Sequence, residues 1–276
     1  MKELALYNLK EGMVLAKDIT TPSGQVVLEK GKKLTKQSIL RLSFYNIKSA
    51  CIVDGEEKQA APKSYSQKIK TSQKFQSFQV DHTIVLSQIR VSFEGYVNEG
   101  RPLDTSALLS KVVELFQSCK TSLELFNMLH NMHSSDDSVY VHSLNVSLIC
   151  RQIGKWIKAD DATLDMLTLA GLLHDIGKLK IPTELLNKPG KYTDEEFAQV
   201  RLHTQYGYEL LKPLPLDAHI KLAALSHHER CDGTGYPSGL KTNDIDPYAR
   251  VVAIADVYDA MTTARSYRAP LCAFQV

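Results

Sequence analysis

The sequence predicts a mainly α protein: an all-α domain preceded by a small α+β N-terminal module and a helical connector. Beyond residue 75, apolar residues recur at three- and four-residue spacing, as they do on the buried face of a helix. Short runs of strand type, bounded by turn residues, occur in the first 57 residues. We therefore expect the module at 1–57, a linker and helical connector at 58–133, and the helical domain at 134–276.

The N-terminal module is predicted from local patterns. Strands are expected at 13–16, 25–28 and 49–53, with a turn at 21–24 and an amphipathic helix at 34–42. Thr35 stands where the N-cap of that helix would be. Because no pattern in this module carries catalytic chemistry, we expect an accessory role for it.

The connector begins with a polar, lysine-rich stretch, which is typical of a linker or of an exposed helix start. Apolar residues then follow helical spacing, for example from Leu108 to Phe116. A helical connector is compatible with a homodimer. The histidines of this region have no partners at ligand spacing and are expected to be incidental; they are His82, His130 and His133.

Bulk composition narrows the possible functions. A formal net charge of +2 gives no general case for binding nucleic acid or a membrane surface. The five cysteines are scattered and include no C-x-x-C pair, which argues for a reducing compartment. No apolar run approaches the ~18 residues of a membrane span. The sequence therefore predicts a cytoplasmic protein with neither nucleic acid nor membrane as a partner.

The chemistry of the chain centres on the adjacent pair His174-Asp175. The pair follows a buried helix expected over residues 164–173, and Lys178 lies four residues after His174, on the same face if the helix continues. An imidazole beside a carboxylate suits a divalent metal, and the carboxylate can bridge two ions.

More ligand-type residues lie at helix ends and turns of the same region. His142 sits within an apolar helical stripe. A capping box at 193–196 begins a helix that carries His203. Apolar runs lead into three more residues of this kind: His227, His228 and Asp256. A glycine-rich loop at 229–239 lies among these ligand candidates, so we expect it to contact the substrate.

Together these side chains predict a metal-dependent phosphohydrolase. Imidazole and carboxylate donors suit Fe, Mn, Co, Ni or Zn, and no thiolate is placed to select zinc. Two ions about 3.5–4 Å apart, bridged by Asp175 and a hydroxide, would supply both a nucleophile and a Lewis acid. Lys178 would neutralise a non-bridging phosphate oxygen.

The motifs resemble those of a known family. His174-Asp175 with the distant Asp256 resembles the HD phosphohydrolase superfamily. The segment 227–230, together with Asp232-Gly233 and Gly235-Tyr236-Pro237, is similar to the HD-GYP subfamily. The resemblance covers about residues 135–276, and the first 57 residues look, more weakly, like a module found ahead of such domains.

The resemblance implies an all-α catalytic domain with a bi- or trinuclear centre, often of iron or manganese. It implies hydrolysis of cyclic di-GMP to linear pGpG and, in some members, on to GMP. The implied metal ligands are His142, His174, Asp175, His203, His227, His228 and Asp256. Asp175 and Lys178 are the implied catalytic residues, with Lys178 on the scissile phosphate. The implied lining of the nucleotide pocket is Tyr236, Asp259, Arg265 and Arg268.

Three features depart from the family pattern. Trinuclear members carry a Glu where this chain has Ser138, so we expect two divalent metal ions, and pGpG as a product. The motif of His203 usually continues with Pro, where this chain has Thr204. Family domains usually extend further than Val276, so the domain is expected to be truncated at its C-terminus.

Two alternatives to an active cyclic di-GMP phosphodiesterase stay open. The chain could be an inactive regulator that binds cyclic di-GMP or a signalling-domain partner, because the Gly-Tyr-Pro loop would serve as well for a protein contact. It could also hydrolyse another nucleotide, because a fold does not fix its substrate.

Overall fold

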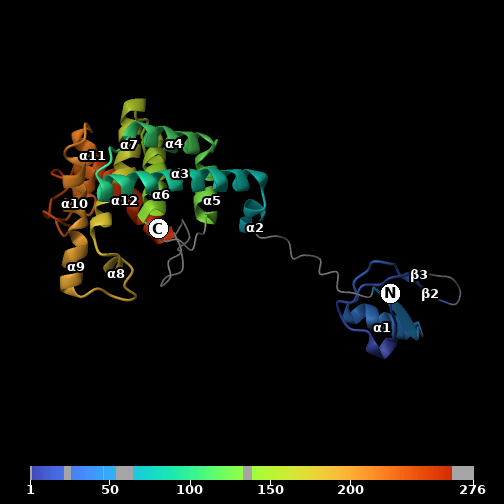
Figure 1. Cartoon of the computed structure of the whole chain (residues 1–276). Coiled ribbons are helices and arrows are strands. Elements are labelled where there is room, and N and C mark those ends of the chain that lie inside the picture. Colours follow the sequence, from blue (N-terminus) through green and yellow to red (C-terminus); the bar gives the residue numbers. More distant parts are fainter. Residues whose placement is uncertain (1, 22–25, 46, 54–64, 133–138, 263–276) are drawn as a thin grey trace. The chain divides into compact units, whose positions relative to one another are not determined.

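The computed structural model describes residues 2–21, 26–45, 47–53, 65–132 and 139–262 (Figure 1). The chain divides into two compact units, Met1–Ser64 and Tyr65–Val276. Helices dominate the described residues, which confirms the predicted mainly α class. Among these residues there is no helix whose length and hydropathy would let it cross a bilayer.

The first unit is a small α+β module, as predicted. β1 (Lys2–Ala5) pairs antiparallel with β4 (Ser49–Ile52), and β2 (Ile19–Thr20) pairs antiparallel with β3 (Val26–Leu28). A short 3-10 helix, η1 (Leu6–Asn8), follows β1.

α1 (Lys36–Phe44) completes this module. The hydroxyl of Thr35 accepts a hydrogen bond of 3.1 Å from the backbone N–H of Ser38, so Thr35 caps the helix as expected. The buried residues Leu15, Leu34 and Leu42 belong to one hydrophobic cluster, which is the core of the module.

The strand predicted at 13–16 is wrong. Val14 and Leu15 form only isolated bridges, to Lys33 and Ile52, because the backbone changes partner between these two residues. The strands expected at 25–28 and 49–53 correspond to β3 and β4, whereas β1 and β2 were not predicted. Residues 22–24 of the expected turn, and residue 25 of the strand expected at 25–28, lie outside the described residues.

The second unit consists of helices. Its elements are α2 (Tyr65–Lys70), α3 (Gln73–Glu99), α4 (Thr105–Gln117), α5 (Ser122–Asn131), α6 (Val139–Trp156), α7 (Asp161–Leu173), η2 (Ile176–Lys180), α8 (Thr183–Leu186), α9 (Asp194–Arg201), α10 (His203–Leu211), α11 (Ala218–Ser226) and α12 (Pro247–Thr262). α6 packs against α7, α12, α3 and α4, so it lies at the centre of the unit (Figure 1).

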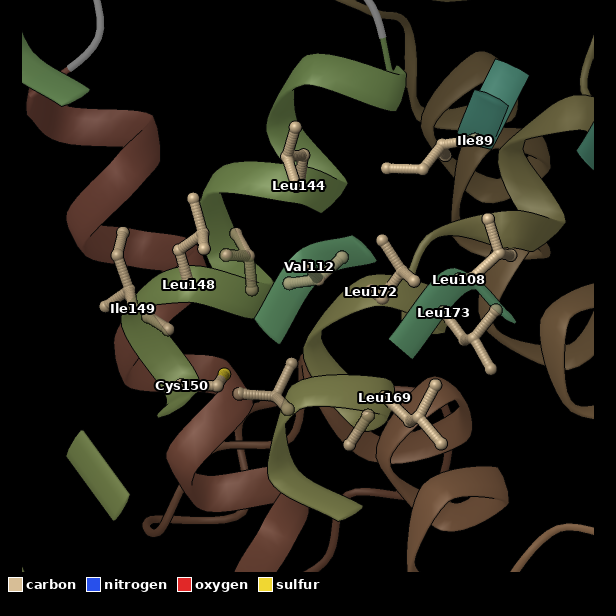
Figure 2. Packing of buried hydrophobic residues seen from close by; sticks show 14 of the residues in the cluster. Ile89, Leu108, Val112, Leu144, Leu148, Ile149, Cys150, Leu169, Leu172 and Leu173 are labelled. Atoms are coloured by element: carbon tan, nitrogen blue, oxygen red, sulfur yellow. The ribbon is translucent and has the colours of Figure 1, made fainter. Parts of the chain in front are cut away.

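The core of this unit forms around α6 and α7. Leu144 and Leu148 of α6 pack with Leu172 and Leu173 of α7 (Figure 2). All four side chains are completely buried, as expected for helices whose apolar residues extend around most of the surface. Substituting Ala for one of these leucines would lower the free energy of unfolding by about 2–5 kcal/mol.

Helices of the predicted connector contribute to the same core. Ile89 of α3 and Leu108 and Val112 of α4 belong to the cluster of α6 and α7 (Figure 2). The compact unit begins at Tyr65, and the expected boundary at residue 57 falls in a segment outside the described residues. The three-part division of the chain stays a prediction.

Candidate metal centre

The His174-Asp175 pair lies at a change of direction. α7 ends at Leu173, and η2 begins at Ile176, so the helix does not continue through the pair. Lys178 nevertheless reaches Asp175, and its Nζ donates a hydrogen bond of 2.6 Å to Oδ2 of that residue.

Gly177 explains why this turn can approach α10. A Cβ atom at this position would lie 2.0 Å from the carbonyl oxygen of His203 and 2.4 Å from the backbone nitrogen of Gly207. Such distances are far below any normal contact, so only glycine allows η2 to pack on α10. This close packing brings His203 next to the pair His174-Asp175.

One group of donors combines α6 with the end of α7. The groups His142, His174 and Asp175 offer ligand atoms that lie within 4.8 Å of one another. Oδ2 of Asp175 lies 3.2 Å from Nε2 of His174 and 3.6 Å from Nε2 of His142. Asp256 of α12 joins this group, with Oδ1 2.9 Å from Nε2 of His142.

A second group combines α10 with the end of α11. Ligand atoms of His203, His227 and His228 also lie within 4.8 Å of one another. Oδ1 of Asp175 faces this group, at 3.5 Å from Nε2 of His203 and 3.7 Å from Nε2 of His227. The two oxygens of Asp175 therefore face different groups.

Two buried polar atoms at the junction have no hydrogen bond among the described residues: Nε2 of His174 and Oδ1 of Asp175. Buried polar atoms are rarely left without a partner, because the lost hydration is costly. A nitrogen lone pair and a carboxylate oxygen in this situation fit metal ions, and the other donors are imidazoles and carboxylates as well.

Hydrogen bonds on the far side of each ring orient three of the histidines. Nδ1 of His174 lies 2.8 Å from the carbonyl oxygen of Gly171, and Nδ1 of His203 lies 2.7 Å from that of Val200. Nδ1 of His227 lies 3.0 Å from the carbonyl oxygen of Ala223. A carbonyl can only accept, so each Nδ1 carries the proton and each Nε2 presents a lone pair to the centre.

The protonation of the centre suits a cation. Burial lowers the pKa of His174 and lowers that of His203 to about 3, so both rings are neutral. Burial raises the pKa of Asp175, but the electrostatic interaction with the neighbouring His174 ring and the positive charge of Lys178 outweigh it and hold that pKa well below its usual range.

His142 differs from these neutral histidines. Burial lowers its pKa, but hydrogen bonds and charges from Asp256 and Asp259 outweigh burial and raise the pKa of His142 to about 10. Nδ1 of His142 lies 2.7 Å from Oδ2 of Asp259, whereas Nε2 faces Asp256 and Asp175. A metal ion must therefore displace a proton from this ring.

The Gly-Tyr-Pro loop is fixed by Glu229. Its carboxylate accepts hydrogen bonds from the backbone N–H groups of Ser238, Gly239 and Leu240, at 2.7, 3.1 and 2.9 Å. These bonds fold the loop back onto the end of α11, and the ring of Tyr236 lies 4.8 Å from that of His228 between centroids. The loop is thereby placed beside the second donor group.

A surface of two aromatic rings and a guanidinium adjoins the loop. Cζ of Arg201 lies 5.0 Å from the ring centre of Phe197 and 5.5 Å from that of Tyr236. The two rings are themselves 6.2 Å apart. Rings and guanidinium planes stack on nucleobases, so this surface has the chemistry of a base-binding site.

The structure brings all seven predicted metal ligands and Lys178 together, and it places Tyr236 beside them. Asp259 is buried, with its carboxylate on His142 and Asn145. Arg265, Arg268 and Ser138 lie outside the described residues. With Thr204 after it, His203 still begins α10 and faces Asp175, and the Thr204 hydroxyl donates a hydrogen bond of 3.0 Å to the carbonyl oxygen of Arg201.

Sequence reasoning missed several residues around the centre. Glu229 belongs to the segment 227–230 that carries the family resemblance, but its role in holding the loop was not predicted. Arg201 and Phe197 belong to the helix before His203, where only their spacing of four residues was visible. Asn145 carried no signal in the sequence beyond its position in a buried helix.

The sequence matches the pattern of the HD domain family over residues 108–275. This match covers more than half of the chain. A solved structure of an HDG"Y"P protein from Bdellovibrio bacteriovorus is similar in fold, with a TM-score of 0.54 and 18% sequence identity. The similarity covers 95% of this chain and 88% of that one.

Curated relatives share higher identity over the helical part. A cyclic di-GMP phosphodiesterase of Pseudomonas aeruginosa is 39% identical over 170 residues, which are 61% of this chain and 41% of that protein. A cyclic di-GMP phosphodiesterase of Thermotoga maritima is 39% identical, over 54% of this chain and 40% of its own. A 3'3'-cGAMP-specific phosphodiesterase of Vibrio cholerae is 37% identical, over 55% of this chain and 30% of that protein. The chain thus spans less than half the length of these relatives.

Proposed function

Because the chain belongs to the HD domain family and its motifs resemble those of the HD-GYP subfamily, we propose that it is a metal-dependent phosphodiesterase that hydrolyses cyclic di-GMP to pGpG. One observation carries the proposal. The buried carboxylate of Asp175 directs one oxygen to His174 and the other to His203, at the junction of two donor groups. This arrangement suits two cations that share one bridging ligand.

The proposed cofactors are two divalent ions, iron or manganese. His142, His174 and Asp256 would hold one ion, and His203, His227 and His228 the other, with Asp175 between them. Such a pair supplies Lewis acidity and lowers the pKa of an attacking water when bound. Donors of nitrogen and oxygen type are consistent with both metals.

Residues of the chain itself would bind and orient the substrate. Lys178, whose ammonium already lies against Asp175, would contact a non-bridging oxygen of the scissile phosphate. Tyr236, with Phe197 and Arg201, would stack on a guanine base. Arg265 and Arg268 remain proposed phosphate contacts on the strength of the family resemblance alone.

The product and the partners belong to the same proposal. With Ser138 where trinuclear relatives carry a Glu, hydrolysis would stop at pGpG. Three exposed apolar residues on α3, Val80, Ile84 and Val91, support a homodimer through the connector, because these residues are 58%, 49% and 57% exposed. The location that belongs to this proposal is the cytoplasm.

The second candidate is a regulator of low or no activity that binds cyclic di-GMP or a signalling domain. The exposed positions Asp232, Thr234 and Ser238 of the Gly-Tyr-Pro loop favour it, because a partner protein could reach them beside the centre. Binding without turnover in the metal-loaded protein would distinguish this role from that of an enzyme.

The experiment that tests the proposal is metal analysis on protein purified without oxygen, with hydrolysis followed on the same sample. Fe(II) and Mn(II) would each be supplied, and cyclic di-GMP and 3'3'-cGAMP assayed in parallel. We expect about two ions per chain and release of pGpG. If the protein binds two ions but hydrolyses 3'3'-cGAMP alone, the proposed substrate is wrong. Two bound ions without any turnover would favour the regulator. Protein that binds no metal would contradict the proposed metal centre.

A further inference from the structure

A continuous row of buried polar side chains links the connector helix α3 to the metal centre. Nε2 of His82 lies 3.4 Å from Oδ1 of Asn145, and Nδ2 of Asn145 donates a hydrogen bond of 3.0 Å to Oδ1 of Asp259. Oδ2 of Asp259 lies 2.7 Å from Nδ1 of His142. The row starts on α3, crosses α6 and α12, and ends on a proposed metal ligand.

The row has a defined hydrogen-bond direction. An ionised carboxylate only accepts, so Asp259 must receive both the amide group of Asn145 and the Nδ1 proton of His142. The amide oxygen of Asn145 then faces His82, which must donate. Burial lowers the pKa of His82 more than Asn145 and Asp259 raise it, so the ring is neutral and has one N–H to give. Each partner thereby fixes the next.

This support differs from that of the other histidines in the centre. His174, His203 and His227 hold their Nδ1 atoms on backbone carbonyls a few residues earlier in their own helices. His142 instead depends on a side chain of α12, which in turn depends on side chains of α6 and α3. Its orientation is therefore sensitive to the placement of separate helices.

His82 is well held in its position. The side chain is only 2% exposed, and the ring of Phe78, one turn earlier on α3, lies 5.9 Å away between centroids. A polar ring costs free energy in such a place unless its hydrogen bond is made. An apolar residue would fill the same space without that cost, so the ring is better explained by the partner it orients.

We propose that His82 is a positioning residue that orients the metal ligand His142 through Asn145 and Asp259, so that helix α3 helps to set the metal affinity of the centre. This inference rests on the proposed function in one respect, since it takes His142 as a ligand. A shift of α3 that separates His82 from Asn145 would let the Asn145 amide turn and would thereby weaken the hold of Asp259 on His142.

The test measures the dissociation constant of Mn(II) for the whole chain, without substrate. His82→Leu removes the donor, and we expect it to weaken Mn(II) binding about tenfold, the lower end for residues that support metal ligands. His82→Gln restores an N–H donor and should return the constant to within about twofold of wild type. Equal affinity of wild type and H82L, or equal losses in H82L and H82Q, would overturn the proposal.

A matched control separates positioning from general stability. Val85 lies three residues further along α3, is buried, and has an apolar side chain. Val85→Ala should lower Tm but leave the Mn(II) constant unchanged, and a tenfold loss of affinity in V85A would overturn the proposal. If H82L does not fold, Asn145→Ala interrupts the same row, and wild-type affinity in that variant would equally overturn it.

The outcomes also separate this inference from the function on which it rests. Wild-type protein that binds two Mn(II) ions but hydrolyses nothing would contradict the phosphodiesterase, whereas the ratio of constants for H82L and wild type would still test the row. Hydrolysis by wild type with unchanged affinity in H82L would contradict the row alone. Wild type that binds no Mn(II) would overturn both.

Discussion

The ammonium of Lys178 lies 2.6 Å from Oδ2 of Asp175, the same oxygen that faces Nε2 of His142 and of His174. The side chain is about a quarter exposed, so it can reach a ligand as well as the carboxylate. Asp175 carries a full negative charge in this environment, because the interaction with His174 and the positive charge of Lys178 keep its pKa low. The lysine thus contacts the proposed bridging ligand while part of its side chain stays open to solvent.

Lys178→Met is expected to lower the rate of hydrolysis by about a hundredfold, because it removes a positive charge that would stabilise the negative charge developing on the phosphate. The number of bound metal ions should stay the same, since an ammonium is no metal donor. Kinetics and metal analysis on the same preparation measure both. Lys188→Met, which breaks only a contact with Glu196, is the control. Loss of metal in K178M would show that the lysine supports the ligands and does not act on substrate.

Asp175→Asn should remove metal and turnover together, even though the shape of the side chain is kept. The amide has one acceptor oxygen in place of two and carries no negative charge, so it cannot act as a ligand toward both donor groups. His174→Ala should have the same effect. Asp165→Asn, at a more exposed carboxylate that contacts Arg151, is the matched control. Two metal ions in D175N would contradict the bridging role.

The affinity for Mn(II) is expected to rise with pH. The pKa of His142 is raised to about 10, so the ring carries a proton at neutral pH, and a metal ion must displace it. Release of this one proton tightens binding of the ion held by His142 about tenfold for each pH unit gained, up to the pKa. His203, with a pKa of about 3, adds nothing to this slope above pH 5. Titrations at pH 6.5, 7.5 and 8.5 measure the slope, and a constant affinity above pH 7.5 would contradict it.

Arg201→Gln should raise KM for a cyclic dinucleotide about tenfold and leave the metal content unchanged. The guanidinium lies against Phe197 and Tyr236, where stacking on a base is worth about 1–3 kcal/mol. Arg250→Gln, at an exposed residue of α12, is the control for loss of charge. An unchanged KM in R201Q would show that the substrate does not use this surface.

The sequence predicts most donors of the centre because several of them follow apolar runs whose spacing indicates a buried helix. Such spacing says where a helix ends, and His174 and His227 both lie at helix ends. It does not reveal side-chain contacts between helices far apart in the chain. His82 and Asn145, which are 63 positions apart, meet only after α3 packs on α6. β1 was missed for the same reason, because its partner β4 lies at the other end of the module.

The facing glycines Gly177 and Gly207 give the sharpest test of the packing that assembles the two donor groups. A Cβ at Gly177 would meet the backbone of α10 at 2.0 Å, whereas a Cβ at Gly207 would lie 3.6 Å from its nearest neighbours, at ordinary contact distance. Gly177→Ala should therefore push η2 from α10, lower Tm and reduce the bound metal. Gly207→Ala should leave metal binding intact and keep or raise Tm, because alanine favours a helix interior by up to about 1 kcal/mol.

Thermal unfolding and metal analysis of both variants measure this difference, and because the substitution is the same, side-chain size alone cannot account for it. Equal Tm and metal content in G177A and G207A would mean that η2 does not need close packing on α10. Metal loss in G177A with an unchanged Tm would instead place the effect at His203, whose carbonyl oxygen is the atom nearest to the added methyl group. In either case, the pair of variants measures how far the metal centre depends on the packing of η2 against α10.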